Sequence, residues 1–300
     1  RIPLKLEDVT DRIFQGLKTG ADKVYIVEEI QRRANKVKIY SREKETEFWL
    51  EPTLLHPLVK GGDSDRYHLS RTSRLVLFPY SAINQGRTTS LPAATMKKDF
   101  PLTWAYLEAN KPYLESREAG QMRGSEWYAY TRNQALDVIQ TSKIFTPDIA
   151  LRASFSLDET GELFFTGGVA GGYGIVVSAG RSRTFILGLL NSRLLDWYVQ
   201  QGATQMRGGY YSYESRFIRG APIVVPDMSV PTDKARHDRI VALVEKMLEL
   251  NKKKHSGKLA PSELDRLERE IAATDAQIDD LVYELYGITA EERKIVEAQQ

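Results

Sequence analysis

The sequence has no cysteine, so disulfide bonds and thiolate metal ligands are excluded. This composition is typical of proteins kept in a reducing compartment, and we expect a cytoplasmic protein. Histidine is scarce as well, and the four residues share no ligand spacing of a helix or a hairpin. They are His56, His68, His237 and His255. The sequence therefore predicts no metal centre.

Long apolar runs are also missing, because no stretch of about 18 apolar residues occurs in the chain. We therefore expect no helix that spans a membrane. The N-terminal segment is charged and irregular, and it lacks the pattern of a signal peptide. The first residue is arginine instead of methionine, so we expect a piece of a longer protein.

The motifs of three enzyme classes are incomplete. Adenine amino-methylation needs an Asn-Pro-Pro-aromatic loop, and this chain has no Pro-Pro pair. A PD-(D/E)xK nuclease needs its acidic residues and lysine on adjacent strands, but Glu292 and Lys294 fall on the first turn of an expected helix. The glycine cluster TGGVAGGYG (166–174) lacks the spacing of a nucleotide-binding loop and is typical of a flexible hairpin or loop. We predict no catalytic centre in this chain.

What is present is an ordinary globular composition, with 42% hydrophobic and 27% charged residues among 300. Alternating apolar residues and turn signals predict strands at residues 22–29, 33–41 and 73–81. Residues 50–70 are expected to be mostly loop, because Pro52, Pro57 and a Gly-Gly pair interrupt them.

A helix is expected to begin at Pro101 and to end or kink at Pro112. Short strands are then predicted at residues 126–132, 143–150, 153–158, 161–168 and 173–180. Residues 184–201 are apolar on nearly all sides, which indicates a buried helix, and 221–226 are expected to return to the sheet. This order predicts a mixed α/β globule of the α+β type with a mixed sheet.

Residues 227–300 have a different pattern. Apolar residues recur at intervals of three and four in two long segments that a short turn joins. In the second segment they form a heptad stripe of Leu264, Leu267, Ile271, Thr274, Ile278, Leu281 and Leu285. Gly287 suits a helix C-terminus, and TAEE (289–292) resembles a capping box. We predict an antiparallel helical hairpin, a spacer or docking arm at 227–300, after a recognition domain at 1–226.

Basic and aromatic residues gather in the first domain. Residues 233–300 hold 12 Lys and Arg against 15 Asp and Glu, so the basic excess lies in the preceding part. Between residues 60 and 98 the basic residues are Lys60, Arg66, Arg71, Arg74, Arg87, Lys97 and Lys98, opposed only by Asp63 and Asp65. WYAYTR (127–132) and MRGGYYSYESR (206–216) add rings and arginines beside glycines. Such a surface suits a polyanion, while buried rings and ion-paired arginines are the alternative.

The order of several segments is informative. They are IFQGLKTGADKVYIV (13–27), LLHPLVKGGDSDRY (54–67), LVLFPY (75–80), YLEANKPYLESRE (106–118), WYAYTR (127–132), KIFTPDIALRASFSLDETGELFFT (143–166), LLNSRLLDWYV (189–199) and YESRFIRGAPIVVP (213–226). The series resembles the TaqI-like C-terminal specificity domain of type II restriction–modification proteins. The tail IDDLVYELYGITAEERKIVE (278–297) is similar to the ends of spacer helices in such proteins and in type I specificity subunits.

The resemblance implies a target recognition domain that reads a short double-stranded DNA sequence, chiefly through the major groove. It also implies that an upstream domain of the same polypeptide, with S-adenosylmethionine, flips and methylates adenine. Such proteins are often fused to an endonuclease, which would need Mg²⁺. Within this chain the resemblance implies no cofactor, and it carries no base-reading residue across.

From the residues themselves we predict DNA contacts in the first turn, in the basic loop and in the aromatic stretches. They are Gln15, Lys18, Thr19, Lys60, Arg66, Arg71, Arg123, Tyr128, Arg132, Arg207, Tyr210, Tyr211 and Arg216. The alternative is a protein–protein assembly module that acts through its heptad helices, with the globule as a scaffold. An enzyme complete in this chain would need an acid, base or metal cluster that the sequence lacks.

Overall fold

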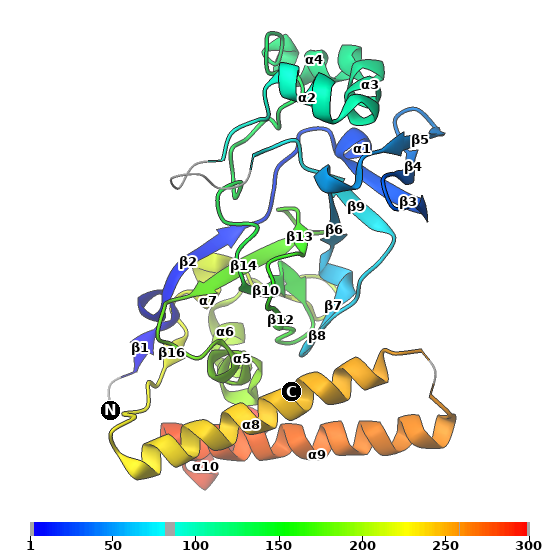
Figure 1. The fold of residues 1–300 in the computed structure, drawn as a ribbon. Coiled ribbons are helices and arrows are strands. Elements are labelled where there is room, and N and C mark those ends of the chain that lie inside the picture. Colours follow the sequence, from blue (N-terminus) through cyan, green and yellow to red (C-terminus); the bar gives the residue numbers. More distant parts are fainter. Residues whose placement is uncertain (1–2, 82–87, 258, 299–300) are drawn as a thin grey trace.

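The computed structural model describes residues 3–81, 88–257 and 259–298, and Arg87 of the basic loop lies outside them. Figure 1 shows helices α2–α4 at the top, two sheets in the middle and the paired helices α8 and α9 at the bottom. The mixed α/β fold with helices at its C-terminus is confirmed. Two apolar clusters form the core, one in each half of the molecule.

The upper half is built on a six-stranded sheet in the order β13-β6-β9-β3-β4-β5. Its strands are β3 (Ile26–Arg32), β4 (Val37–Ser41), β5 (Thr46–Leu50), β6 (Leu55–Val59), β9 (Arg74–Leu77) and β13 (Phe164–Phe165). All neighbours are antiparallel except β13 and β6. The expectation of a loop over 50–70 is wrong for β6, which is paired on both sides. Pro57 is tolerated because β13 pairs only with Leu58 and Val59.

Helices and buried rings cover the upper sheet. The helices are α1 (Asp22–Tyr25), α2 (Ala93–Asp99), α3 (Pro101–Ala109) and α4 (Lys111–Gly120). Helix α3 ends at Asn110, just before Pro112, and α4 follows it, as expected. The strand expected at 126–132 is wrong: the segment forms turns, and Trp127, Tyr128 and Tyr130 are buried in the upper core. The first four residues of the strand expected at 22–29 are helical.

The lower half contains a four-stranded antiparallel sheet in the order β12-β10-β14-β2. Its strands are β2 (Thr10–Gln15), β10 (Lys143–Pro147), β12 (Ser156–Asp158) and β14 (Gly172–Val177). The helix expected at 184–201 is two helices, α5 (Arg183–Asn191) and α6 (Arg193–Gly202). Ser192 separates them with an extended backbone, and its hydroxyl caps the N-terminus of α6.

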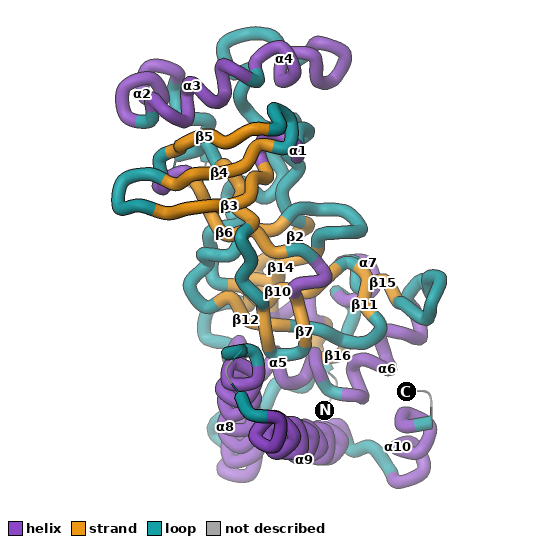
Figure 2. The backbone as a smooth tube through the Cα atoms, turned by 90° about the vertical axis from the view of Figure 1, so that its right-hand side faces the viewer, coloured by secondary structure: helices purple, strands orange, loops and turns teal. Residues whose placement is uncertain are grey.

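Short elements complete the fold. They are β1 (Leu4–Lys5), β7 (Ser64–Asp65), β8 (His68–Leu69), β11 (Ile149–Ala150), β15 (Tyr211–Ser212), β16 (Pro222–Ile223), α7 (Ser215–Ile218) and the 3₁₀ helices η1 (Leu6–Val9), η2 (Pro52–Leu54) and η3 (Gly61–Asp63). The expectation that 221–226 returns to the main sheet is wrong, because β16 pairs only with β1. In Figure 2, β11 and β15 lie on the right side of the molecule.

The C-terminal helices are α8 (Pro231–Lys254), α9 (Pro261–Tyr286) and α10 (Ala290–Glu297). They share an apolar cluster with α5 and the lower sheet, in which Ile240, Val244 and Ile278 are fully buried. The helices α5 and α8 approach closely at Gly188, where a Cβ atom would come within 2.7 Å of Val244 Cγ2. Gly287 ends α9 with a left-handed φ of 67°, and a capping box begins α10, as the sequence indicates. The hairpin is therefore packed onto the globule.

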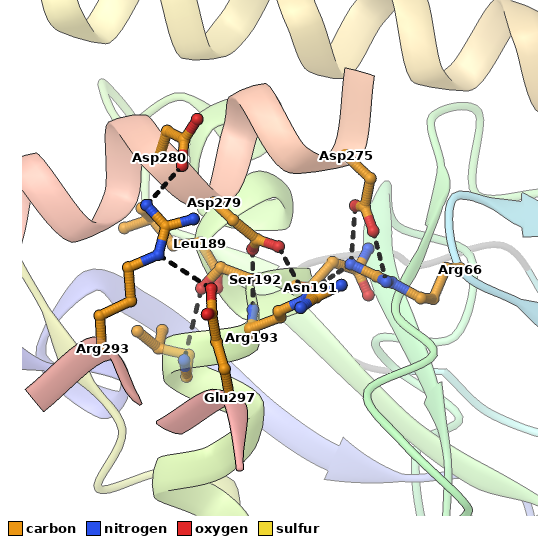
Figure 3. A network of polar contacts seen from close by, with 11 residues as sticks. Arg66, Leu189, Asn191, Ser192, Arg193, Asp275, Asp279, Asp280, Arg293 and Glu297 are labelled. Carbon is orange, nitrogen blue, oxygen red and sulfur yellow. Dashed lines mark hydrogen bonds and ion pairs between the residues drawn. The ribbon is translucent and has the colours of Figure 1, made fainter. Parts of the chain in front are cut away.

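A polar network also ties α9 to the globule (Figure 3). Arg66 forms a two-pronged contact with Asp275 and donates to the backbone carbonyl of Asn191. Asp279 accepts the backbone N–H of Arg193 and lies 3.2 Å from its guanidinium Nε. Burial raises the pKa of Asp279 to about 6, with a further rise from nearby Asp275 and opposing contributions from its contacts to Arg193. The network fixes α9 against the start of α6.

Candidate nucleic-acid interface

Residues 166–172, here called the glycine loop, join the last residue of β13 to β14. Three turns from distant parts of the sequence hydrogen-bond to this loop. The N–H of Gly167 donates to Leu17 at 2.9 Å, and the N–H of Gly61 donates to Ala170 at 3.0 Å. The N–H of Asp148 donates to Gly171 at 3.2 Å. The glycine cluster is thus a junction of three turns, held by backbone contacts.

Close backbone approach explains the glycines in this loop. A Cβ atom on Gly171 would overlap the carbonyl oxygen of Thr166, and one on Gly172 would overlap that of Thr146. Gly61, across from them, would bring its Cβ within 3.2 Å of the carbonyl oxygen of Gly171. Side chains larger than hydrogen would therefore push the turns apart.

One hollow, of about 380 Å³, opens beside the glycine loop, and we call it the upper hollow. It is lined by Leu17, Lys18, Thr19, Gly20, Ala21, Asp22, Glu118, Thr131, Arg132, Thr166 and Gly167. The structure thus brings together Lys18 and Arg132, which are both exposed and both predicted as contacts. Arg132 Nη2 lies 3.5 Å from Glu118 Oε2. Both signs of charge therefore face this hollow.

A second hollow, of about 420 Å³, lies next to two of these turns, at Gly61 and Pro147, and we call it the lower hollow. It is lined by Gly61, Gly62, Ser64, Asp65, Pro147, Ile149, Ala150, Leu151, Arg152, Ser154 and Tyr210. Tyr210 comes from a hairpin in which the N–H of Met206 donates to the carbonyl of Tyr210 at 2.6 Å. Gly208 and Gly209 make its tip possible with φ values of 84° and 82°. Arg207 at this tip is exposed.

Polar side chains bond to one another and to the backbone beside the first turn. Gln15 Nε2 donates to the Tyr173 hydroxyl at 3.4 Å, and Gln134 donates to the carbonyl of Gly16 at 2.5 Å. Burial raises the pKa of Tyr173 to about 12, with smaller contributions from Asp148 and Glu214. The phenol therefore stays neutral and can donate or accept a hydrogen bond.

Other predicted contacts have partners inside the protein. Thr19 is 1% exposed and donates to Asp22, and Tyr128 is 2% exposed and donates to the carbonyl of Leu91. The Arg66 side chain is 13% exposed and paired with Asp275. These three side chains are held in the interior by packing and hydrogen bonds, and we leave them out of the interface.

The remaining predicted residues are exposed or half-buried at the surface. Lys60 is half-buried and precedes Gly61, with its N–H bonded to Asp63. Tyr211 is half-buried in β15, next to Tyr210. Arg216 is exposed and pairs with Glu214, and Arg71 is exposed and pairs with Glu162. Arg123 is exposed near the end of α4.

The sequence alone does not indicate several residues of this face. Glu118 lines the upper hollow and Gln134 donates to the carbonyl of Gly16, and both come from segments far from the first turn in sequence. Leu151 and Arg152 line the lower hollow, and Val169, in the glycine loop, is an apolar side chain that is 71% exposed. An apolar residue among glycines is the single local signal, because the others depend on tertiary contacts.

A family model, the TaqI-like C-terminal specificity domain, matches residues 56–223, which is more than half of the chain. The chain belongs to this family. It is a DNA-recognition module of the restriction–modification type. The residues matched by this TaqI-like domain include the glycine loop, Arg132 and the hairpin of Arg207 and Tyr210, and they end before α8. No curated protein matches the chain.

Neither a membrane-spanning helix nor a metal-binding cluster occurs in the described part of the TaqI-like chain. Within residues 3–81, 88–257 and 259–298, no helix is both long and apolar enough to cross a bilayer. Over the same residues no three His, Asp or Glu side chains gather as ligands.

Proposed function

We propose that the TaqI-like domain reads a short sequence in double-stranded DNA with the face that surrounds the glycine loop. The observation that carries this proposal is the junction of three turns on that loop, beside two open hollows. The loop itself lines the upper hollow, and two of the turns together with Tyr210 line the lower one. Loops displayed by a rigid scaffold suit recognition because their side chains are exposed while their backbones are fixed.

Two classes of contact are expected on this face. Exposed cations at its edges, such as Arg207 and Arg152, bind phosphates and set the register of the duplex. Gln15, which is partly exposed and bonded to the Tyr173 hydroxyl, is expected to contact a base edge. Phosphate contacts make affinity depend steeply on salt concentration.

The parent protein supplies the chemistry in this proposal. We assign adenine methylation to an upstream domain of the same polypeptide, which binds S-adenosylmethionine and flips the target base. If the parent also cleaves DNA, the nuclease and its Mg²⁺ belong to a further domain. The TaqI-like chain directs these activities to their site, and helices α8–α10 act as a spacer that docks it.

Affinity selection from a pool of randomised duplexes tests the proposal. The chain is expected to enrich one short sequence, and titration by fluorescence anisotropy at several salt concentrations should then show steep salt dependence for that duplex. Equal binding of the enriched and the scrambled duplexes, with no effect of salt, would contradict it.

The assembly function through heptad helices has less support. Leu267, Thr274 and Ile278 of the stripe are buried, and Ile271, Leu281 and Leu285 are partly buried against the lower core. Six of the seven stripe residues are thus covered by the chain itself. An assembly partner would have to bind the polar outer faces of α8 and α9.

A further inference from the structure

The backbone beside the upper hollow has an unusual conformation. Glu118 and Ala119 follow one another with left-handed φ values of 50° and 55°. Residues with a side chain rarely adopt this region, and a pair of them in sequence persists only where the surroundings impose it. The result is that the carboxylate of Glu118 lines the hollow instead of continuing the outer face of α4.

Arg117 provides the constraint. Its guanidinium is buried and donates to the carbonyls of Thr19 at 3.1 Å, Trp127 at 2.6 Å and Ala129 at 2.9 Å, and its Nε donates to Leu114 at 2.8 Å. One side chain therefore ties together the end of α4, the first turn and the segment that carries Arg132. Residues of these segments line the upper hollow together with Thr166 and Gly167.

The charges around this hollow are balanced. Lys18 and Arg132 face it together with Asp22 and Glu118. Two carboxylates repel a phosphate group, so a balanced hollow is a poor phosphate site. A carboxylate beside an arginine instead offers one acceptor and one forked donor next to each other. Exposed side chains at a 3.5 Å separation form a weak pair in water, so each can exchange its partner for a ligand group.

We propose that Arg132 and Glu118 together read one G·C base pair in the major groove. Arginine binds the O6 and N7 acceptors of guanine with two hydrogen bonds, and glutamate accepts from the N4 amino group of cytosine. No other base pair offers two acceptors on one base and an amino donor on its partner in that order. This inference rests on the proposed function and adds to it the identity of one recognised base pair and of the residues that select it.

Selection from randomised duplexes with the whole chain and its variants tests this proposal. Wild type should fix G·C at one position. Arg132→Lys keeps the charge but loses the fork, so preference at that position should fall by about 5- to 150-fold, with other positions unchanged. Glu118→Gln keeps the shape but adds an amide donor, so the same position should broaden towards T·A, with adenine in the place of cytosine, because glutamine pairs with adenine.

Arg293→Lys and Asp280→Asn are matched controls, because this exposed ion pair lies on α10 and α9, with 2.7 Å between the two groups. Both should leave every position of the selected sequence unchanged. Melting curves should confirm that these four variants, and Arg132→Ala, fold.

The outcomes separate the two proposals. If wild type selects a sequence but Arg132→Lys and Glu118→Gln alter no single position, the reading pair is wrong and the recognition function stands. The reading pair is equally wrong if Arg132→Ala weakens all duplexes by the same factor and lowers the salt slope by about one, the signature of a phosphate contact. If wild type selects no sequence, the recognition function itself fails.

Discussion

Arg66 and Asp275, which are 209 positions apart in sequence, form a two-pronged ion pair with both N–O distances at 2.8 Å. Arg66 belongs to the turn between β7 and β8, and Asp275 to the middle of α9. The side chains are 13% and 16% exposed, so the pair is largely shielded from water. A residue that composition places in a basic, ligand-facing loop thus joins the helical hairpin to the globule.

Arg66→Met should therefore lower the free energy of unfolding by about 2–4 kcal/mol, because it leaves the Asp275 carboxylate without its partner in a partly buried place. Denaturant titration measures this change. Lys246→Met is the matched control, since its pair with Glu270 is 46% and 42% exposed, and it should lose less than about 1 kcal/mol. Equal losses for both variants would contradict the role given to Arg66.

The titration of Asp279 predicts a pH dependence of stability. Its pKa of about 6 in the folded protein lies above its ordinary value of 3.8, chiefly because of burial. The folded state thus binds this proton more tightly than the unfolded state, so the stability contribution is fully present below about pH 4 and is lost as pH rises through about 6.

Asp279→Asn should remove this contribution, which amounts to at most about 3 kcal/mol. Denaturant titrations of both proteins at several pH values between 4 and 7 measure it. The difference in unfolding free energy, variant minus wild type, should increase with pH across this window. A difference that stays constant would mean that Asp279 titrates alike in both states.

The glycine loop offers a test of its close packing. Gly171→Ala should displace the loop, because the new Cβ would overlap the carbonyl oxygen of Thr166. We expect DNA affinity to fall at least about tenfold, equivalent to about 1.4 kcal/mol. Gly220→Ala is the control, since nothing lies within 4 Å of its Cβ position and its φ is not left-handed. Anisotropy titrations that find the same affinity in both variants would show that the loop does not shape the interface.

The hairpin tip should contact phosphate. Arg207 is exposed beside two left-handed glycines, where the tip can reach the backbone of a duplex. Arg207→Ala should weaken cognate and scrambled duplexes by the same factor and reduce the salt slope by about one. The measurement is a set of anisotropy titrations over a range of salt concentrations. Loss of discrimination at a single base pair would instead place Arg207 on a base edge.

Local signals account for the elements that the sequence predicts well. Pro112, Gly287 and the capping box at Thr289 act within one or two helical turns, and the structure has helix boundaries at each. The strands β9 and β10 likewise follow from apolar runs bounded by turns. Ser192 shows the limit of such signals, because it divides an apolar run into two helices. A serine also occurs within helices, so its presence in the sequence does not by itself indicate a helix end.

Tertiary contacts account for what the sequence could not predict. Nothing near Glu118 in sequence indicates its left-handed backbone, which depends on carbonyls of Thr19, Trp127 and Ala129 that accept from Arg117. Tyr128 has aromatic neighbours and an arginine nearby in the sequence, as an exposed binding stretch would have. In the structure it is nevertheless buried. Composition indicates candidate stretches but not which side chains of each face solvent.

The most direct measurement of the central claim is hydrogen exchange of the chain with and without its selected duplex. We expect protection of amides in residues 16–22, 130–134, 166–172 and 205–211, which belong to or adjoin the upper hollow, the glycine loop and the Tyr210 hairpin. Exchange should stay unchanged in β4, β5 and the outer faces of α8 and α9. Protection confined to the helical hairpin or to the β3–β4–β5 edge, with none around the glycine loop, would contradict the account.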